Sequence, residues 1–336
     1  MRKRRLGAIA GIALAGLALS ACSGGAEGSG GDAEHVLRVA FNQNIDHPQA
    51  QALEELSKKL SEQTDGKYAL QVYPDETLGD QASTIEQVQS GTIDFAIVAG
   101  SLLENFVDDF SVVNLPYVWD SPEQQMQVLN DTSIMGDLYD ELGDSDLRVM
   151  TAYHGGVRNV YSSVGPVKEP ADLAGQKIRV IESDTNVSMM KLMGGIGTPM
   201  AQGEVYTAIQ SGVLDGAENN ELIYSSLSHD EIAPYYSYTK HLMMPDYLLI
   251  SPKVWDAMDA DTQEVFTTLL QESVDTELKL FAEATEKAKA DAEEAGAEFN
   301  DADVDAFRDA VQPLVDKSIS NDRTQAIYDA ITDSRG

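Results

Sequence analysis

Residues 175–220 read GQKIRVIESDTNVSMMKLMGGIGTPMAQGEVYTAIQSGVLDGAENN. The stretch begins with a predicted strand, residues 177–180, that carries the basic residue Arg179. It ends in a polar cluster at residues 215–220, just after a predicted helix that stops at Gly212. In open α/β sheets ligands bind at the carboxyl ends of strands, so Arg179, like Arg158 earlier in the chain, can point into a cleft. Asn219 lies at the end of a predicted strand.

The chain before this stretch alternates between strands and helices. Strands are predicted over residues 36–41, 68–73 and 95–98, and helices over about 49–64 and 81–90. This β-α-β-α-β order indicates an α/β domain. The segment VQSGTID at 88–94 is matched by IQSGVLD at 209–215, and each copy closes a helix with a glycine before a strand. The repeat predicts two lobes of similar topology.

The rest of the chain predicts a hinge and a helical C-terminal part. Strands are predicted over residues 147–153, 159–163, 236–241 and 247–251, and helices over about 122–142, 252–296, 303–318 and 321–332. Gly155 and Gly156 are the predicted crossover between the lobes. We expect residues 36–155 plus about 245–290 in lobe I, and residues 156–244 plus about 300–336 in lobe II. Such discontinuous lobes are usual in hinged binding proteins.

The N-terminus has the features of a bacterial export signal. Four basic residues at positions 2–5 precede an apolar segment at 6–19 that is too short to span a membrane comfortably. The segment ends in Leu-Ser-Ala-Cys at 19–22, which resembles a lipobox, where the cysteine becomes the lipidated first residue of the mature protein. We expect a signal peptide at 1–21, and a lipidated Cys22 with a flexible tether at 22–35. The protein would then be extracytoplasmic and lipid-anchored to the cell membrane, on its periplasmic or outer face.

The composition argues against a nucleic-acid partner and against a disulfide bond within the chain. The formal charge is −33, and removal of residues 1–21, which carry four basic residues and no acidic ones, leaves −37. Such a surface repels phosphate backbones, so we expect no nucleic-acid partner; the acidity itself fits solubility or a salty medium. Cys22 is the only cysteine, which excludes an intrachain disulfide, and the Gly/Ser-rich run after it disfavours a buried free thiol.

The sequence also lacks the common catalytic and cofactor motifs. It has no Gly-x-Ser-x-Gly motif, no Walker-type phosphate loop and no His-Glu-x-x-His helix. The five histidines are scattered without metal-ligand spacing. We therefore expect no catalytic residues, no cofactor and no bound metal.

Arginine is scarce, and after the signal it occurs only at positions 38, 148, 158, 179, 308, 323 and 335. A guanidinium offers a rigid fork of donors that matches a carboxylate at two points and stays charged when it is desolvated. Arg158 follows a glycine pair and Arg179 lies in a short strand, so both are candidates for carboxylate binding. A surface ion pair is an equally good local interpretation for each arginine, and turn formation is the simplest local role for Asn219.

Four segments together resemble one known family. They are QKIRV at 176–180, GTPM at 197–200, EVYTAIQ at 204–210 and DGAENN at 215–220. They resemble the solute-binding component of TRAP transporters of the DctP type, and the resemblance extends from about residue 36 to beyond residue 255. It implies an α/β, two-lobed, periplasmic-binding-protein-like fold with a hinge and long C-terminal helices.

The resemblance also implies roles for individual residues. Arg179 matches the arginine that forms a two-point salt bridge with the substrate carboxylate, Arg158 matches a second arginine near that group, and Asn219 matches an asparagine that orients it. Glu218 belongs to a motif that resembles members taking sugar acids such as uronates. Gln202 stands where many members have an aromatic residue, which leaves a more polar wall and disfavours a sialic-acid-like ligand. Further ligand contacts from the first lobe are implied for Asn42, His47, Asp80 and Gln81.

The function implied by the resemblance is extracytoplasmic capture of a small organic acid, such as a uronate, for the small and large membrane subunits of a TRAP transporter. Two alternatives from other classes remain: a ligand-sensing lipoprotein that signals to a membrane receptor, and a secreted enzyme acting on acidic sugars. Uptake and transcriptional response in a deletion strain separate transport from sensing. Product formation from uronates by the pure protein would reveal an enzyme.

Overall fold

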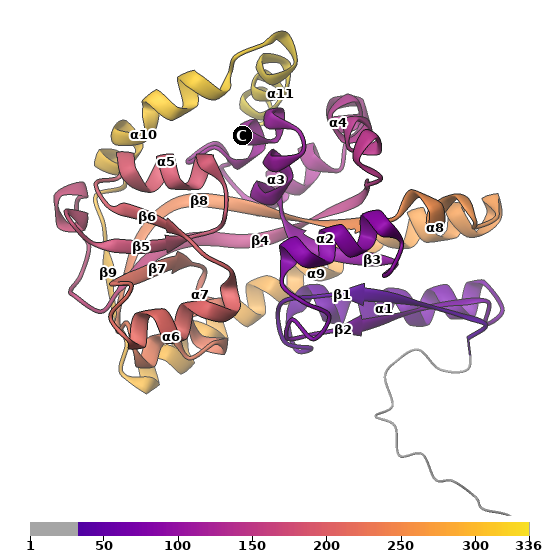
Figure 1. The fold of residues 1–336 in the computed structure, drawn as a ribbon, viewed down its shortest axis with the longest axis horizontal. Coiled ribbons are helices and arrows are strands. Elements are labelled where there is room, and N and C mark those ends of the chain that lie inside the picture. The colour runs from indigo at the N-terminus through magenta and orange to yellow at the C-terminus, as the bar shows by residue number, and fades with distance from the viewer. Residues whose placement is uncertain (1–32, 336) are drawn as a thin grey trace, which may run out of the picture.

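A single mixed sheet forms the centre of residues 33–335, the part of the chain that the computed structural model describes (Figure 1). Its strands follow the order β2-β1-β3-β8-β4-β7-β5-β6, and β9 pairs with β8. Their bounds are β1 His35–Ala40, β2 Tyr68–Tyr73, β3 Phe95–Ala99, β4 Arg148–Ser162, β5 Lys177–Val180, β6 Ile196–Pro199, β7 Gly216–Asn219, β8 Tyr235–Ile250 and β9 Glu298–Asp301. The predicted signal peptide, Cys22 and the tether up to residue 32 lie outside the described residues.

β4 and β8 are long strands that pair antiparallel and join the two ends of the sheet. β1, β2 and β3 lie at one end, and β5, β6 and β7 at the other (Figure 1). The prediction of four separate short strands in these regions was wrong, because Gly155 and Gly156 lie inside β4. The register shifts between His154 and Val157, and Gly156 has a φ of +87°. This bulge interrupts the alternation of side chains on which strand prediction depends.

The predicted β-α-β-α-β order of the N-terminal part is confirmed. β1 pairs in parallel with β2 and with β3, and the intervening helices are α1 Pro48–Gln63 and α2 Gln81–Ser90. α2 is followed by Gly91 with a φ of +74°, and α6 (Val205–Gln210) is soon followed by Gly212 with a φ of +73°. The two copies of the repeated segment therefore end their helices through the same left-handed glycine geometry.

The helices of the middle of the chain are shorter than the sequence predicts. Asp131 accepts a hydrogen bond from the Ser133 backbone N–H (2.8 Å) and starts a new helix, so the predicted helix over residues 122–142 is divided. The helices here are α3 Pro122–Leu129, α4 Thr132–Asp140, α5 Asp184–Leu192 and α7 Glu221–Ser226. The 3₁₀ helices are η1 Gly100–Asn105, η2 Asp108–Asn114, η3 Glu141–Ser145, η4 Pro170–Leu173, η5 Gln202–Glu204 and η6 His229–Glu231.

The C-terminal part is helical, as predicted. Its helices are α8 Pro252–Asp256, α9 Ala260–Ala295, α10 Val304–Ser318 and α11 Asp322–Asp333. The 36-residue α9 packs against α1 and β4 and also against α7, so it reaches both ends of the sheet (Figure 1). α10 contacts β8, α5 and η2, whereas α11 contacts η2, α3 and α4. None of the helices in residues 33–335 has the length and apolar character that crossing a bilayer demands.

Gly216 should be essential for the close approach of β7, the strand of Glu218 and Asn219, to β4. A Cβ at this position would lie 2.1 Å from the carbonyl oxygen of Tyr161. Gly216→Ala should therefore lower the free energy of unfolding by about 1–3 kcal/mol, as measured by urea denaturation. Gly165→Ala is the control, because nothing lies within 4 Å of a Cβ there. Equal unfolding midpoints for the two variants would contradict this account of β7.

Candidate functional site

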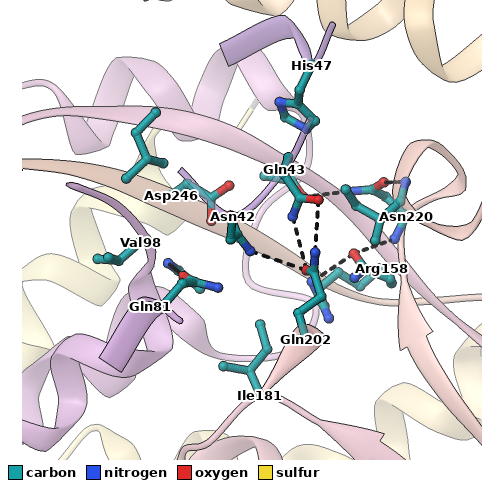
Figure 2. Close-up of a pocket in the computed structure, with 15 residues that line it drawn as sticks. Asn42, Gln43, His47, Gln81, Val98, Arg158, Ile181, Gln202, Asn220 and Asp246 are labelled. Atoms are coloured by element: carbon teal, nitrogen blue, oxygen red, sulfur yellow. Dashed lines mark hydrogen bonds between the residues drawn. The ribbon is translucent and has the colours of Figure 1, made fainter. Parts of the chain in front are cut away.

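A small cavity of about 20 Å³ lies beside the middle of the sheet, where loops from both of its ends meet (Figure 2). Most of its polar lining consists of amide side chains. The lining residues are Asn42, Gln43, His47, Gln81, Ile97, Val98, Ala99, Gly155, Arg158, Ile181, Gln202, Asn219, Asn220, Ile223 and Asp246. Of the nine residues predicted from the sequence to contact a ligand, six belong to this lining: Asn42, His47, Gln81, Arg158, Gln202 and Asn219.

Arg158 is bound by a carboxylate of the protein itself. Its Nε donates to Glu218 Oε2 at 2.5 Å and its Nη2 donates to Glu218 Oε1 at 2.8 Å, which is a two-point ion pair. Nη2 also donates to the Glu218 backbone carbonyl (2.7 Å), and Nη1 donates to Asn219 Oδ1 (3.0 Å). Arg158 and Glu218 are 4% and 1% exposed, so the pair is desolvated. Glu218 therefore acts in this structure as the counter-charge of Arg158.

The electrostatics of Glu218 follow from this pairing. Burial by itself raises the pKa of Glu218, but the charge of Arg158 and hydrogen bonds from His241 and Arg158 outweigh it and lower the pKa to about 2. His241 approaches with its Nε2 at 3.3 Å from Glu218 Oε2. Although burial opposes its charge, the pKa of Arg158 is raised by Glu218. Both partners are therefore ionised at neutral pH.

Arg179 is buried to the same degree but has a different environment. It is 3% exposed, and its Nε donates to the Met200 backbone carbonyl at 2.7 Å. Within residues 33–335, no carboxylate oxygen lies within 4.0 Å of its guanidinium nitrogens. Burial and then the nearby charge of Arg158 lower the pKa of Arg179, and Glu218 opposes them. The structure thus holds a desolvated cation that the described part of the chain does not neutralise directly.

The position of Arg179 in the sheet relates it to Asn219. Arg179 pairs with Ala217 of β7, and Ala217 pairs with Tyr161 of β4. Because side chains alternate along a strand, Arg179, Tyr161 and Asn219 belong to the same face of the sheet. Arg179 is not among the residues that line the cavity. It therefore lies close to the same strands as the cavity but does not open into it.

The two asparagines at the end of β7 have different roles. Asn219 Oδ1 accepts hydrogen bonds from Arg158 Nη1 and from the Asn220 backbone N–H, both at 3.0 Å. Asn220 is the N-cap of α7: its Oδ1 accepts from the Ile223 backbone N–H (2.9 Å), and its Nδ2 donates to the Gly155 carbonyl (2.8 Å). Asn220 thus has a local role as the cap of α7. Asn219 connects the Arg158–Glu218 ion pair to the cavity.

Gln202 joins the two walls of the cavity (Figure 2). Gln43 Nε2 donates to Gln202 Oε1 at 3.0 Å, and Gln202 Nε2 donates back to Gln43 Oε1 at 2.9 Å. Asn42 Nδ2 also donates to Gln202 Oε1, at 3.3 Å. Asn42 and Gln43 follow β1, whereas Gln202 begins η5 after β6, so these bonds bridge opposite ends of the sheet.

The remaining predicted residues have capping or supporting positions. His47 lines the cavity as the N-cap of α1, and burial lowers its pKa to about 3, so it is neutral at physiological pH. Gln81 lines the cavity, and its Oε1 accepts from the Ala99 backbone N–H (2.6 Å). Asp80 caps α2 by accepting from the Ser83 backbone N–H (2.7 Å), and it does not belong to the cavity lining.

Sequence reasoning missed Gln43 and Asp246. Gln43 belongs to the polar loop that begins at Asn42, and the polarity of that loop was the available signal. Asp246 lies in β8 between the two predicted strands, and nothing local distinguishes it from the other acidic residues of the chain. Within residues 33–335, no cluster of three or more His, Cys, Asp or Glu side chains is arranged to hold a metal ion.

The family of the chain follows from comparison with known sequences. The model of the DctP family, described as "Bacterial extracellular solute-binding protein, family 7", matches residues 40–322. The chain belongs to this family. It is 34% identical to a solute-binding protein of Chromohalobacter salexigens, over 81% of this chain and 81% of that protein.

Solved structures of TRAP periplasmic solute-binding proteins have the same fold. One from Anaerococcus prevotii, with bound D-glucuronate, has a TM-score of 0.86 and 36% identity, over 89% of this chain and 97% of that chain. One from Xanthobacter autotrophicus, with bound β-D-galacturonate, has a TM-score of 0.84 and 33% identity, over 89% of this chain and 100% of that chain. The expected two-lobed, periplasmic-binding-protein-like α/β fold of this DctP-family member is thereby confirmed.

The ion pair of Arg158 should make the stability of this solute-binding protein depend on pH. The pKa of Glu218 is about 2 in the folded protein against an ordinary value of 4.5. Its contribution is therefore complete above about pH 5 and is lost as the pH falls toward 2, which amounts to about 3 kcal/mol. Glu218→Gln should not lose this part of the unfolding free energy as the pH falls. At pH 7 it should be less stable than the wild type, because Arg158 has no counter-charge.

Urea unfolding of both proteins from pH 7 to pH 2 measures this effect. The difference in unfolding free energy between wild type and Glu218→Gln should shrink as the pH falls. The exposed Glu298 supplies the control, and Glu298→Gln should follow the wild-type curve. A difference between wild type and Glu218→Gln that stays constant over this range would contradict the assigned pairing.

Proposed function

We propose that this chain is the extracytoplasmic substrate-binding component of a TRAP transporter, and that it captures a sugar acid of the uronate class. The observation that carries the proposal is Arg179, a buried guanidinium without a carboxylate within 4.0 Å among residues 33–335. The amide-rich cavity next to it suits a polyhydroxylated ligand, because amides both donate and accept hydrogen bonds. The uronates bound to the similar proteins of Anaerococcus prevotii and Xanthobacter autotrophicus support this ligand class.

The charges around the proposed site match a single carboxylate. Glu218 neutralises Arg158, so within the described residues the positive charge of Arg179 still has to be balanced. A ligand carboxylate can accept two hydrogen bonds from the fork of one guanidinium and restores neutrality in a desolvated place. Asn219, which already accepts from Arg158 Nη1, has an amide group left to donate toward that carboxylate. Binding, without any change in covalent bonds, is the function that these groups support.

Movement of the two lobes would admit the ligand. The cavity of about 20 Å³ is far below the roughly 300–1,000 Å³ of typical ligand sites. The Gln43–Gln202 amide pair would therefore have to separate, with the bulge at Gly155 and Gly156 in β4 as the hinge. A ligand held by both walls favours the closed form, because it binds that form more tightly than the open one. The lobe boundaries predicted above remain part of this proposal.

Replacement of Arg179 tests the proposed function. Arg179→Ala should reduce the affinity for D-glucuronate or D-galacturonate by about 2–5 kcal/mol, roughly 30-fold to several thousandfold, because a buried charge pair loses one partner. Arg179→Lys should also bind poorly, since one ammonium cannot replace a two-point fork. Isothermal titration calorimetry measures these affinities.

The matched control is Arg308→Ala, which removes an arginine that is half exposed on α10 and paired with Asp305. Its affinity should equal that of the wild type. Thermal unfolding without ligand establishes that the Arg179 variants are folded. Nearly unchanged uronate binding by Arg179→Ala would refute the proposed role.

We further propose that Cys22 carries a lipid that holds the protein at the outer face of the membrane, close to the membrane subunits of the transporter. The support is the Leu-Ser-Ala-Cys pattern at residues 19–22, together with family membership of extracellular solute-binding proteins. The Gly/Ser-rich residues after Cys22 would give the binding domain freedom to reach those subunits.

Cys22→Ser should move the protein from the membrane fraction to the soluble fraction of expressing bacteria. It should also abolish incorporation of labelled fatty acid, while uronate affinity stays at the wild-type value. Ser23→Ala is the control and should remain in the membrane fraction. Membrane retention of Cys22→Ser would exclude this anchor.

A further inference from the structure

Asp246 is the only carboxylate among the residues that line the cavity (Figure 2). It lies on β8, a central strand, where Ala99 of β3 is its partner on one side and Tyr153 of β4 on the other. A charged side chain in the middle of a sheet is unfavourable unless it is hydrogen-bonded or neutralised. Its presence at the cavity therefore suggests a role in binding rather than in packing.

Two neighbours hold the Asp246 carboxylate in place. Gln49 Nε2 donates to Asp246 Oδ2 at 2.8 Å and to the His154 carbonyl at 3.1 Å, so both hydrogens of this amide nitrogen are used. Gly155 leaves space for this carboxylate, because a Cβ there would lie 3.1 Å from Asp246 Oδ2 and 2.6 Å from the Met244 carbonyl oxygen. The carboxylate is thus oriented before any ligand arrives.

The second oxygen of Asp246 remains available. Oδ1 has no hydrogen-bond partner among residues 33–335, and the side chain is only partly buried because it borders the cavity. Asn42 and Gln43, which border the same part of the cavity, form their hydrogen bonds with Gln202 instead (Figure 2). An oriented carboxylate oxygen of this kind accepts hydrogen bonds from hydroxyl groups and repels another carboxylate.

The pKa of Asp246 is raised above its ordinary value, and burial is the main cause. Burial raises its pKa, whereas the hydrogen bond from Gln49 and the charge of Arg158 lower it. Behind it on α9, Glu277 is fully buried, and its Oε2 accepts from the His154 backbone N–H at 3.4 Å. Burial raises the pKa of Glu277 well above its ordinary value, and the charge of Asp246 adds to this rise. Of the two carboxyl groups, Asp246 therefore has the surroundings that better support a negative charge, because Gln49 and Arg158 both act on it.

We propose that Asp246 determines specificity: it accepts a hydrogen bond from a hydroxyl of the ligand and excludes ligands that carry a second carboxylate. This inference rests on the proposed function, in which Arg179 takes the single carboxylate of the ligand. One wall of the cavity then offers Arg158, whose charge also acts on the nearby Arg179, and another offers the Asp246 carboxylate. A sugar acid with one carboxylate and several hydroxyls satisfies both walls, whereas an aldarate brings a like charge toward Asp246.

Calorimetry with D-glucuronate and D-glucarate, which has a carboxylate at each end, tests the proposal. The wild type should prefer glucuronate by about tenfold or more, because like charges in a desolvated site repel strongly. Asp246→Asn should weaken glucuronate binding by about tenfold or more. It should also narrow the preference for glucuronate over glucarate by a similar factor, because the repulsive charge is gone. Asp275→Asn, an exposed residue on α9, removes the same charge outside the cavity lining and should match the wild type.

The outcomes separate the two proposals. If the wild type binds no uronate, the proposed function fails, whatever the variant does. If the wild type binds glucuronate and glucarate equally, or if Asp246→Asn weakens both by the same factor, the specificity role is wrong. Asn can keep the hydrogen bond from Gln49 through its own Oδ1, and thermal unfolding without ligand establishes that the variant is folded. The wild-type preference tests the proposal even if the variant does not fold.

Discussion

The desolvated guanidinium groups in the strands β4 and β5 are the constraint on which the site depends, because a buried cation is unfavourable until an anion neutralises it. Arg158 meets that requirement within the chain, through two carboxylate contacts from Glu218 on β7. Arg179 does not, within the described residues, and its pKa is lowered by burial and by Arg158. The ion pair of Arg158 and Glu218 thus holds β4 and β7 together. Arg179 remains available to bind an anion from outside the protein.

The ion pair is also connected to the place where the two halves of the sheet join. Asn219 accepts from Arg158, and the next residue, Asn220, donates to the carbonyl of Gly155 in the β4 bulge. Gly156 allows this contact, because a Cβ there would lie 2.4 Å from the Asn220 side chain. Asn219 and Asn220 therefore contact the cavity, the ion pair and the bulge at once. A change at the site would act directly on the bulge about which the lobes would rotate.

The two walls of the cavity differ in chemistry. The wall from the β5–β7 end of the sheet presents Arg158 and Gln202, and the wall near β1 and β8 presents neutral amides together with Asp246. Amides such as Gln43 and Gln202 pair with each other across the gap and can exchange that pairing for hydroxyl groups of a ligand. A charged group at each side, with adaptable amides between them, suits a ligand that has an acidic end and a hydroxylated body.

The sequence by itself determined the local structure. The helices α1 and α2, the strand pattern around them and the glycine that ends each repeated segment were predictable, because side-chain periodicity and backbone freedom are properties of neighbouring residues. The scarcity of arginine and the position of Arg179 in a short strand also indicated the carboxylate-binding candidates before any fold was known.

Only the tertiary structure decided which partner each of these candidate residues has. It showed that Glu218 neutralises Arg158, that Gln43 pairs with Gln202 over more than 150 residues of sequence, and that Asp246 borders the cavity. These facts depend on strand order, and on the long pair of β4 and β8, which continues past the bulge in β4 where separate strands were expected. The physical reason is that the energy of a buried charge is set by the groups that folding brings around it, and not by its neighbours along the chain.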